Sequence, residues 1–410
     1  MRSLVTGGAG FIGSSLVREL VARGDDVTVI DDLSRGRRNA LPEGVRLHRA
    51  DVADAVAMRA LLRARRPDRV FHLAAHTDVN ASLLDGADDT RVNVAGTVNV
   101  LEAARAAGVG RVVFASSAAV YGPTQHLPTP ESAQPRPESC YGQGKLAGED
   151  YCRLFTRVHG LETVCLRLSN VYGPRQRPEG EAGVVALFSR AAVGGEEATI
   201  FNDGSQTRDF VHVADVAAAM IAAAEAPDAA GQTFNVASGR ETTLLDVLGA
   251  VQRAAGGGPQ PRMAPARAGD VPRSCLDPSR AQQQLAWQAR MPIERGLADT
   301  VAWMHGHAAE VGTRRERARA AIVRTTARPA AAAHIALAAV RAVALAALTV
   351  AITLLTTGDL SLPDLGHDVL VDAPMGALHA TIRHLVLSTL LACAISAIVY
   401  RQRRAAAVRR

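Results

Sequence analysis

Lysine is almost absent from this chain of 410 residues. Of its 46 basic residues only one, Lys145, is a lysine, and it follows Tyr141 by four positions. Arginine carries its charge on a rigid planar fork and stays protonated, whereas lysine is a compact charge whose pKa follows its surroundings. Lys145 is therefore either a chance survivor on a solvated helix face or a cation that a guanidinium cannot replace, such as one beside a phenol that must lose its proton.

Cysteine pairs and metal-binding motifs are also absent. The five cysteines (140, 152, 165, 275 and 393) form no Cys-x-x-Cys pair, and the chain has no His-Glu-x-x-His run. These absences argue against a disulfide framework and the common zinc motifs, so we expect a reduced, metal-free protein. No apolar run follows a basic leader at the N-terminus, so we do not expect secretion through a signal peptide.

Excess positive charge is confined to the end of the chain. Residues 314–410 hold 13 arginines and 5 acidic residues, which leaves 33 basic and 35 acidic residues in 1–313. The net charge of +6 therefore belongs to the tail. The main body gives no reason to expect nucleic acid as a partner.

The first 170 residues alternate short β-rich runs with helical patterns. The expected strands are 3–6, 26–30, 45–48, 70–73, 111–115 and 163–168, with helices such as 12–23 and 93–107 between them. Regular alternation is typical of a parallel sheet covered on both faces. We therefore predict an α/β fold in which residues 1–170 form a Rossmann-type doubly wound domain.

Residues 171–313 are predicted to form a smaller substrate lobe that shares some elements with the first domain. Helices are expected near 183–193, 214–226, 244–255 and 278–286, and a long loop at 256–272. Loops of that length are often functional.

The remaining residues differ in composition from the body. We predict a basic linker at 314–334, a transmembrane helical hairpin at 335–400 and a basic tail at 401–410. At about 1.5 Å per residue, the apolar run 335–357 reaches roughly 34 Å, enough for a hydrocarbon core of about 30 Å. Arginines on both flanks favour cytoplasmic ends, which would hold a cytoplasmic catalytic domain at the inner face of the membrane. The alternative is a soluble pair of alanine-rich helices.

Residues 6–13, with the sequence Thr-Gly-Gly-Ala-Gly-Phe-Ile-Gly, join the first expected strand to a helix. Glycines at this spacing let the backbone turn tightly and approach a pyrophosphate at the helix N-terminus. An acidic residue closes the second expected strand, where it can bind ribose hydroxyls and repel a 2′-phosphate. This favours NAD over NADP, although arginines at 35, 37 and 38 weaken the preference. The cofactor residues predicted here are Gly7, Gly10, Phe11, Ile12, Gly13, Asp31 and Asp32.

Three side chains form a candidate catalytic set. Ser117 follows the fifth expected strand, and ligands of open α/β sheets bind beyond the carboxyl ends of the strands. On a helix, Tyr141 and Lys145 lie one turn apart on the same face. A phenol with an ordinary pKa near 10 becomes a usable base when a cation favours its phenolate. We predict that Lys145 lowers the pKa of Tyr141 and that Ser117 bonds the same substrate oxygen.

With these motifs in order, residues 1–305 resemble the extended short-chain dehydrogenase/reductases, in particular the nucleotide-sugar epimerases of the UDP-glucose 4-epimerase type. The matching segments are 6–13, 29–34, 51–52, 71–75, 93–97, 116–122, 141–145, 166–174, 208–213 and 267–270. The resemblance implies NAD as cofactor and a homodimer. It also implies further contacts to NAD, to the adenine and along the nicotinamide side, from Asp51, Val52, Leu73, Ala74, Ala75, Asn93, Tyr141 and Lys145.

The resemblance also implies a nucleotide-diphosphate sugar as substrate. Asn170 and Arg208 would hold the diphosphate, and Arg267 and Asp270 would lie near the diphosphate and the nucleotide ribose. Ser274 matches the position that limits room beside the sugar. A small residue there leaves space for a bulky C2 group, so UDP-N-acetylhexosamines are expected alongside UDP-glucose and UDP-galactose, and sugar acids stay open.

The mechanism implied is epimerisation. Tyr141 as phenolate removes a proton from a sugar hydroxyl, chiefly at C4, while a hydride passes to NAD and then returns to the opposite face. Related dehydratases and decarboxylases usually place an acidic residue where this chain has Ala118 and Ala119, so they are less favoured alternatives, as is a reductase. A non-catalytic membrane-tethered NAD-binding protein would need none of the three catalytic side chains.

Overall fold

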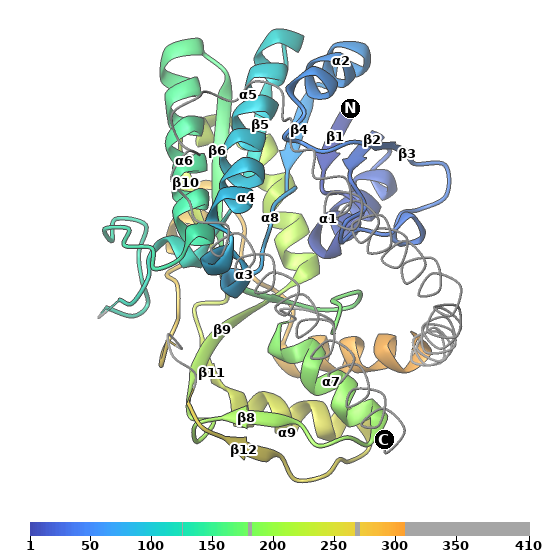
Figure 1. The fold of residues 1–410 in the computed structure, drawn as a ribbon, viewed down its shortest axis with the longest axis vertical. Helices are drawn as coiled ribbons and strands as arrows, with labels where there is room; N and C mark the ends of the chain where they lie inside the picture. The colour runs from blue at the N-terminus through green and yellow to red at the C-terminus, as the bar shows by residue number, and fades with distance from the viewer. Residues whose placement is uncertain (125, 179–182, 267–270, 308–410) are drawn as a thin grey trace, which may run out of the picture. The chain divides into compact units, whose positions relative to one another are not determined.

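The computed structural model describes residues 1–307 except 125, 179–182 and 267–270. Within these residues the largest element is a parallel sheet with the strand order β10-β6-β5-β4-β1-β2-β3 (Figure 1). Its strands, in chain order, are β1 (Arg2–Thr6), β2 (Asp26–Asp31), β3 (Arg46–Arg49), β4 (Arg69–His72), β5 (Arg111–Ser117), β6 (Glu162–Leu168) and β10 (Thr233–Val236). The six strands expected from sequence are present, with their ends shifted by one or two residues, and the Rossmann-type prediction is confirmed.

The order of the strands reverses between β1 and β4. From β1 the chain builds β2 and β3 on one side, and then crosses to build β4, β5 and β6 on the other. In open α/β sheets, ligands bind at the carboxyl ends of the strands beside such a reversal. The sheet therefore places the glycine motif after β1 and the segment after β4 next to the expected cofactor site.

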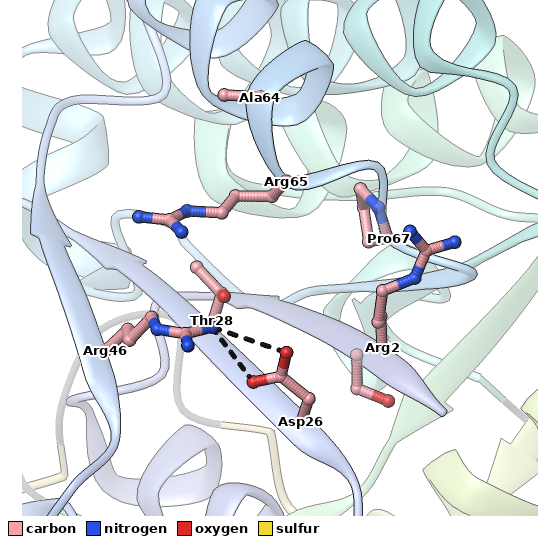
Figure 2. A pocket seen from close by; sticks show the side chains of 8 residues that line it. Arg2, Asp26, Thr28, Arg46, Ala64, Arg65 and Pro67 are labelled. Carbon is pink, nitrogen blue, oxygen red and sulfur yellow. Dashed lines mark hydrogen bonds and ion pairs between the residues drawn. The ribbon is translucent and has the colours of Figure 1, made fainter.

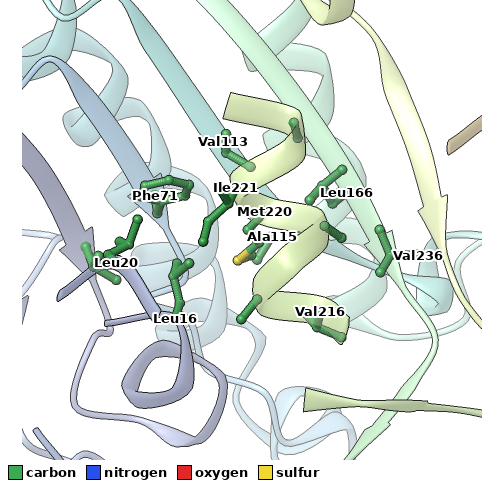
Figure 3. Packing of buried hydrophobic residues seen from close by; sticks show 14 of the residues in the cluster. Leu16, Leu20, Phe71, Val113, Ala115, Leu166, Val216, Met220, Ile221 and Val236 are labelled. Atoms are coloured by element: carbon green, nitrogen blue, oxygen red, sulfur yellow. The ribbon is translucent and has the colours of Figure 1, made fainter. Parts of the chain in front are cut away.

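Helices cover both faces of this sheet (Figure 1). One face carries α1 (Phe11–Ala22) and α8 (Val213–Glu225), and the other carries α2 (Ala55–Arg65), α5 (Gly96–Ala107) and α6 (Cys140–His159). In the first layer, Val216, Met220 and Ile221 of α8 pack in one buried cluster with Leu16 and Val113 (Figure 3). Coverage on both sides explains why the strands read as nearly continuous apolar runs.

Short helical segments connect β4 to the second layer. They are α3 (Val79–Leu84), α4 (Gly86–Thr90) and the π-helical turn η2 (Arg91–Ala95), which continues into α5. The helix predicted at 93–107 therefore starts as a wider turn. Single π-helical turns inside helices are frequent at functional sites.

A smaller group of elements follows β6. A three-stranded sheet contains β7 (Asn170–Tyr172), β9 (Thr207–His212) and β11 (Glu241–Thr243), and a two-stranded one contains β8 (Thr199–Phe201) and β12 (Arg262–Ala264). With them lie α7 (Val184–Gly194) and α9 (Leu244–Ala255). Helix α10 (Ser279–Gln284) packs against β10 of the large sheet instead. The 3₁₀ turns η1 (Arg38–Ala40), η3 (Ala118–Val120) and η4 (Pro227–Ala229) occur elsewhere.

Two details differ from the sequence expectation for this region. The predicted loop 256–272 contains strand β12, which pairs with β8 over three residues. A strand this short, exposed along most of its length, leaves no periodic pattern to detect. In addition, α8 and β10 return to the large sheet, so the chain beyond residue 170 contributes to both groups.

The predicted linker, hairpin and tail at 314–410 lie outside the described residues. Among the residues that are described, none forms a helix with the length and apolar character needed to cross a bilayer.

A buried ion pair ties helix α6 to the sheet. Glu149 is fully buried and accepts two hydrogen bonds from Arg167 of β6, at 2.9 and 2.7 Å. The Ser116 hydroxyl donates to the same carboxylate at 2.5 Å. Since Glu149 follows Lys145 by one helical turn, this contact sets the position of the helix that carries the candidate catalytic residues.

We predict that Glu149→Gln destabilises the fold, because it leaves the buried Arg167 guanidinium without a counter-charge. The free energy of unfolding should fall by about 3 kcal/mol, measured by urea denaturation. Glu102→Gln is the control, because its pair with Arg105 is exposed and should contribute less than about 1 kcal/mol. Equal losses in the two variants would contradict the prediction.

Candidate active site

The glycine motif forms a tight turn between β1 and α1. Gly7 has a φ of +68°, and a Cβ atom there would lie 2.7 Å from the backbone nitrogen of Ala74. At Gly13 a Cβ would lie 2.2 Å from the Gly7 carbonyl oxygen. Both positions therefore require glycine, because any side chain would push the turn away from the strand beside it.

Helix α1 begins directly inside this turn. Gly10 occupies its N-cap and provides no side-chain hydrogen bond to the first turn, where Phe11 and Ile12 stand. The N–H groups at such a helix end, together with the helix dipole, favour a bound anion. The turn thus fits the pyrophosphate of a dinucleotide. The predicted glycines form the tight turn, and the first residues of α1 follow it directly.

Asp31 stands at the end of β2 and is 6% exposed. Its carboxylate accepts hydrogen bonds from the backbone N–H groups of Ala9 and Leu33, both at 2.9 Å. Burial raises the pKa of Asp31, and these two hydrogen bonds oppose that rise. Asp31 therefore holds the glycine turn against the next loop, a structural task in addition to the predicted ribose contact. The neighbouring Asp32 is exposed and bonds Ser34.

The other predicted cofactor residues lie along the carboxyl edge of the sheet. Leu73 donates its N–H to the carbonyl of Thr6 at 3.1 Å, and Ala74 and Ala75 follow it, partly exposed. Val52 is buried against α5, while the Asp51 carboxylate accepts from Arg91 at 2.7 Å. The carboxyl-end segments after β1, β2, β3 and β4 therefore follow one edge of the sheet.

Ser117 and Tyr141 meet where α6 approaches the turn after β5. A Cβ on Gly142 would lie 2.6 Å from the carbonyl oxygen of Ala119, so glycine allows this close approach. The Ser139 hydroxyl caps the helix by accepting from the N–H of Gly142 at 3.0 Å. The Ser117 hydroxyl accepts from the N–H of Ala119 at 3.1 Å, and a hydrogen bond with its side chain opposes the rise that burial causes in the pKa of Tyr141.

Lys145 is 3% exposed, so it is not a solvated surface lysine. Its ammonium donates to the carbonyl oxygen of Ala115 at 2.9 Å and lies 5.0 Å from the centre of the Phe114 ring. The centre of the Tyr141 ring is 5.9 Å away. Burial lowers the pKa of Lys145 to about 8, while the Asp89 carboxylate opposes the shift.

Burial raises the pKa of Tyr141, the hydrogen bond with Ser117 opposes the rise, and the Asp89 carboxylate adds to it. Lys145 is not among the groups that shift this pKa, because its ammonium is directed at the Ala115 carbonyl. The effect of Lys145 on the base therefore stays a prediction for the site with its ligands bound.

Two predicted substrate residues lie on neighbouring strands, and a third lies in a segment bonded to one of them. Asn170 pairs in register with Phe210, so β7 stands beside β9, which carries Arg208. Ser274 donates its N–H to the carbonyl oxygen of Thr207 at 3.2 Å, next to Arg208. Arg267 and Asp270 lie outside the described residues.

Asn93 lies at the centre of a hydrogen-bond network. Its side chain accepts from the N–H of His76 and donates to the His76 carbonyl, both at 2.9 Å. It also donates to Asp89 at 3.0 Å. Asp89 was absent from the sequence-based predictions, although its position one turn before Asn93 on a helix was a usable signal.

A small hollow opens elsewhere, beside the amino ends of β1 and β2 (Figure 2). Arg2, Asp26, Arg46 and Arg65 line it, and Asp26 pairs with Arg46. Its volume of about 80 Å³ is far below the roughly 300 Å³ of a small-molecule site. It also lies at the opposite end of the strands from the site described above.

Residues 3–237 match the model of the NAD dependent epimerase/dehydratase family. The UDP-glucose 4-epimerase of Mycolicibacterium smegmatis is 45% identical over 307 residues, which cover 73% of this chain and 97% of that protein.

Two solved structures agree with this match. The UDP-glucose 4-epimerase of Thermotoga maritima with UDP-glucose is 39% identical, with a TM-score of 0.73 over 75% of this chain and 100% of the other. That of Thermus thermophilus in complex with NAD is 41% identical, with a TM-score of 0.70 over 75% of this chain and 99% of the other. Each relative is matched over nearly its whole length, and the match leaves part of this chain uncovered.

We predict that Gly7→Ala impairs NAD binding, because the added methyl group would collide with Ala74 and displace the turn. The NAD retained by the purified protein should fall sharply when measured by chromatography after denaturation. Gly24→Ala is the matched control: Gly24 also has a positive φ, of +85°, but a Cβ there meets nothing within 4 Å. Both variants carry the backbone strain of about 1–2 kcal/mol, so equal NAD contents would contradict the steric explanation.

Proposed function

Because the chain belongs to the NAD-dependent epimerase/dehydratase family, we propose that it inverts C4 of a nucleotide-diphosphate sugar, either a UDP-hexose or a UDP-N-acetylhexosamine. The observation that carries the proposal is the position of a buried Lys145, whose ammonium lies 5.9 Å from the centre of the Tyr141 ring, on the helix that packs against the turn after β5 and Ser117. A protein that only bound NAD would not need this arrangement.

NAD supplies a hydride acceptor that can return the hydride to either face of the sugar ring. The glycine turn with Gly7, Gly10 and Gly13 would hold its pyrophosphate, and Asp31 its adenosine ribose. The uncapped start of α1 supports this assignment, because it leaves backbone donors for an anion.

The proton is handled by the chain itself. Tyr141 takes the proton of the sugar hydroxyl as the carbon is oxidised and gives it back as the carbon is reduced, so one group serves both directions. Ser117 donates to the same oxygen and fixes its position. Lys145 keeps a positive charge beneath the site, which favours the phenolate once the site is assembled.

Epimerisation is favoured over dehydration by the turn after β5. Elimination of water needs an acid and a base in addition to the tyrosine. The dehydratases that this chain resembles usually carry an acidic residue in this turn. Here Ala118 and Ala119 form the 3₁₀ turn η3, and neither can transfer a proton. A reaction that needs one base and one hydride acceptor is therefore the better fit.

We propose that Asn170, Arg208, Arg267 and Asp270 bind the nucleotide diphosphate and that Ser274 borders the sugar. The pairing of β7 with β9 supports a common site for Asn170 and Arg208. The hydrogen bond from the Ser274 N–H to the Thr207 carbonyl places Ser274 next to Arg208. A serine beside the sugar leaves room for an N-acetyl group. Residues 1–170 would then serve mainly the cofactor and residues 171–313 mainly the substrate.

We further propose that the enzyme is a homodimer that associates through α6. Tyr151, Leu154 and Val158 are 37%, 37% and 59% exposed, and their spacing places them along one stripe of this helix. Apolar stripes on a helix surface are suited to burial against a second chain.

For the end of the chain we propose a membrane hairpin at 335–400 that holds a cytoplasmic catalytic domain at the inner face of the membrane. The support is the sequence: apolar runs, arginine-rich flanks and an acidic loop between the runs. Such a hairpin would deliver the product to enzymes that consume nucleotide sugars at that face.

We predict that Tyr141→Phe lowers kcat by about 10²–10⁴-fold, because the general base is lost, while the bound NAD is retained. The assay incubates the protein with UDP-glucose, UDP-N-acetylglucosamine or UDP-glucuronate and resolves the product sugars by chromatography. Tyr151→Phe is the control, because it removes the same hydroxyl from a tyrosine of the same helix outside the catalytic set and keeps the aromatic ring. Full activity in Tyr141→Phe would exclude the assigned base, and wild-type protein inert on the whole panel would favour an NAD-binding protein.

We predict that the full chain sediments with membranes and that residues 1–313 alone stay in the supernatant and keep their activity. Ultracentrifugation of lysate with and without detergent measures the first point. Full-length protein found in the supernatant without detergent would exclude the hairpin. An inactive truncated protein would mean that the tail belongs to the catalytic fold.

A further inference from the structure

A second acidic residue lies buried next to the catalytic set. Asp89, on helix α4, is 2% exposed. One carboxylate oxygen, Oδ1, accepts a hydrogen bond from Asn93 at 3.0 Å. The other oxygen, Oδ2, is enclosed and has no hydrogen-bond partner among the described residues. A buried oxygen of this kind costs free energy, so its retention calls for an explanation.

The unpartnered oxygen faces helix α6. A Cβ atom on Gly144 would lie 3.3 Å from Asp89 Oδ2 and 3.2 Å from the Cβ of Asn93. Gly144 is one turn after Tyr141 on α6 and directly precedes Lys145 in the chain. The glycine therefore brings the carboxylate directly against the segment that carries the base and its cation.

The charges around Asp89 are few. Lys145 and Tyr141 on α6 and His76 in the segment after β4 interact with it electrostatically, and Asp88 is its neighbour on α4. Asp88 is turned outward, where it pairs with Arg91 and His76.

Lys145 has only weak alternatives to Asp89 as a partner. His72 of β4 is fully buried, and burial lowers its pKa to about 3, so it is neutral. The Cys152 thiol is the other titratable group that acts on the ammonium. Among the described carboxylates, Asp89 is the one whose charge raises the pKa of Lys145 against the effect of burial, whereas the buried Glu149, one turn along α6, is paired with Arg167.

We propose that Asp89 is a positioning residue of the active site: its carboxylate is the counter-charge that keeps Lys145 protonated between the sheet and α6. The catalytic consequence of this role rests on the proposed function, whereas its effect on Lys145 does not.

The charge of Asp89 acts on the pKa of both Lys145 and Tyr141. A negative charge next to Lys145 stabilises its ammonium, and the same charge next to Tyr141 destabilises its phenolate. Removing the charge lowers the pKa of both groups. Asp89 thus keeps Lys145 charged but makes Tyr141 harder to deprotonate. The acidic limb of the pH–rate profile, set by Tyr141, and the alkaline limb, set by Lys145, therefore both depend on Asp89.

The sole lysine allows a direct test. Protein labelled with ¹³C at lysine Cε carries its lysine signal at Lys145 alone, so the pH titration of that signal measures its midpoint in the full-length, NAD-bound protein. In Asp89→Asn the midpoint should fall by about one pH unit or more. Asp88→Asn is the matched control, because it removes the same charge one residue away on the exposed side and should leave the midpoint within a few tenths of a unit.

The kinetic measurement follows kcat/KM against pH. In Asp89→Asn both midpoints should move to lower pH, and Asp89→Glu, which retains the charge, should restore the wild-type positions. The proposal would be overturned if Asp89→Asn lost rate at every pH while the midpoints of its pH–rate profile and of the lysine titration stayed at the wild-type values. Asp89 would then have only a structural role. If Asp89→Asn does not fold by circular dichroism, Asp89→Ser is the second neutral variant and is held to the same two criteria.

The two proposals fail separately. A shifted lysine midpoint in a protein that converts no nucleotide sugar would support the counter-charge and reject the epimerase. If the protein is an active epimerase and the lysine midpoint is the same in the neutral variants as in the wild type, the epimerase is supported and the counter-charge is rejected.

Discussion

Helix α6 approaches the end of β5 more closely than side chains would allow, and the arrangement of the active site depends on this approach. A Cβ on Gly148 would lie 2.5 Å from the Phe114 ring, and one on Gly142 would lie 2.6 Å from the Ala119 carbonyl. Glycine inside a helix costs roughly 1 kcal/mol relative to alanine. The Glu149–Arg167 pair offsets part of that cost and fixes the helix at this depth.

The depth of the helix explains the single lysine. At position 145 the side chain ends in a buried space between the Ala115 carbonyl and the Phe114 ring. One ammonium satisfies both contacts, as a hydrogen-bond donor and as a cation over a ring face. A guanidinium is larger and planar and presents five donors, most of which would be left without partners there. Replacement by arginine is therefore resisted by geometry at this position, whereas exposed positions accept arginine freely.

The parts of the site that could be predicted are those encoded by local sequence. The β-rich runs predicted six strands. The glycine motif predicted a tight turn, because the positive φ at Gly7 and its close contact with Ala74 require glycine. The spacing of Tyr141 and Lys145 predicted their common face. The direction of the Lys145 ammonium and the position of Asp89 could not be predicted, because both depend on contacts between segments far apart in the chain. The short strand β12 was missed for a similar reason, since its partner β8 defines it.

Burial acts on the base and on its cation in opposite senses. It raises the pKa of Tyr141 above its ordinary value and lowers that of Lys145 to about 8. Each group alone would thus tend toward its neutral form, in which neither can perform its role. Neither group is among those that shift the pKa of the other in this geometry, because the ammonium is directed at the Ala115 carbonyl. Asp89 shifts this balance toward the cation and Ser117 shifts it toward the phenolate. A further positive charge near Tyr141, such as a bound cationic ring, would favour its phenolate in these low-dielectric surroundings.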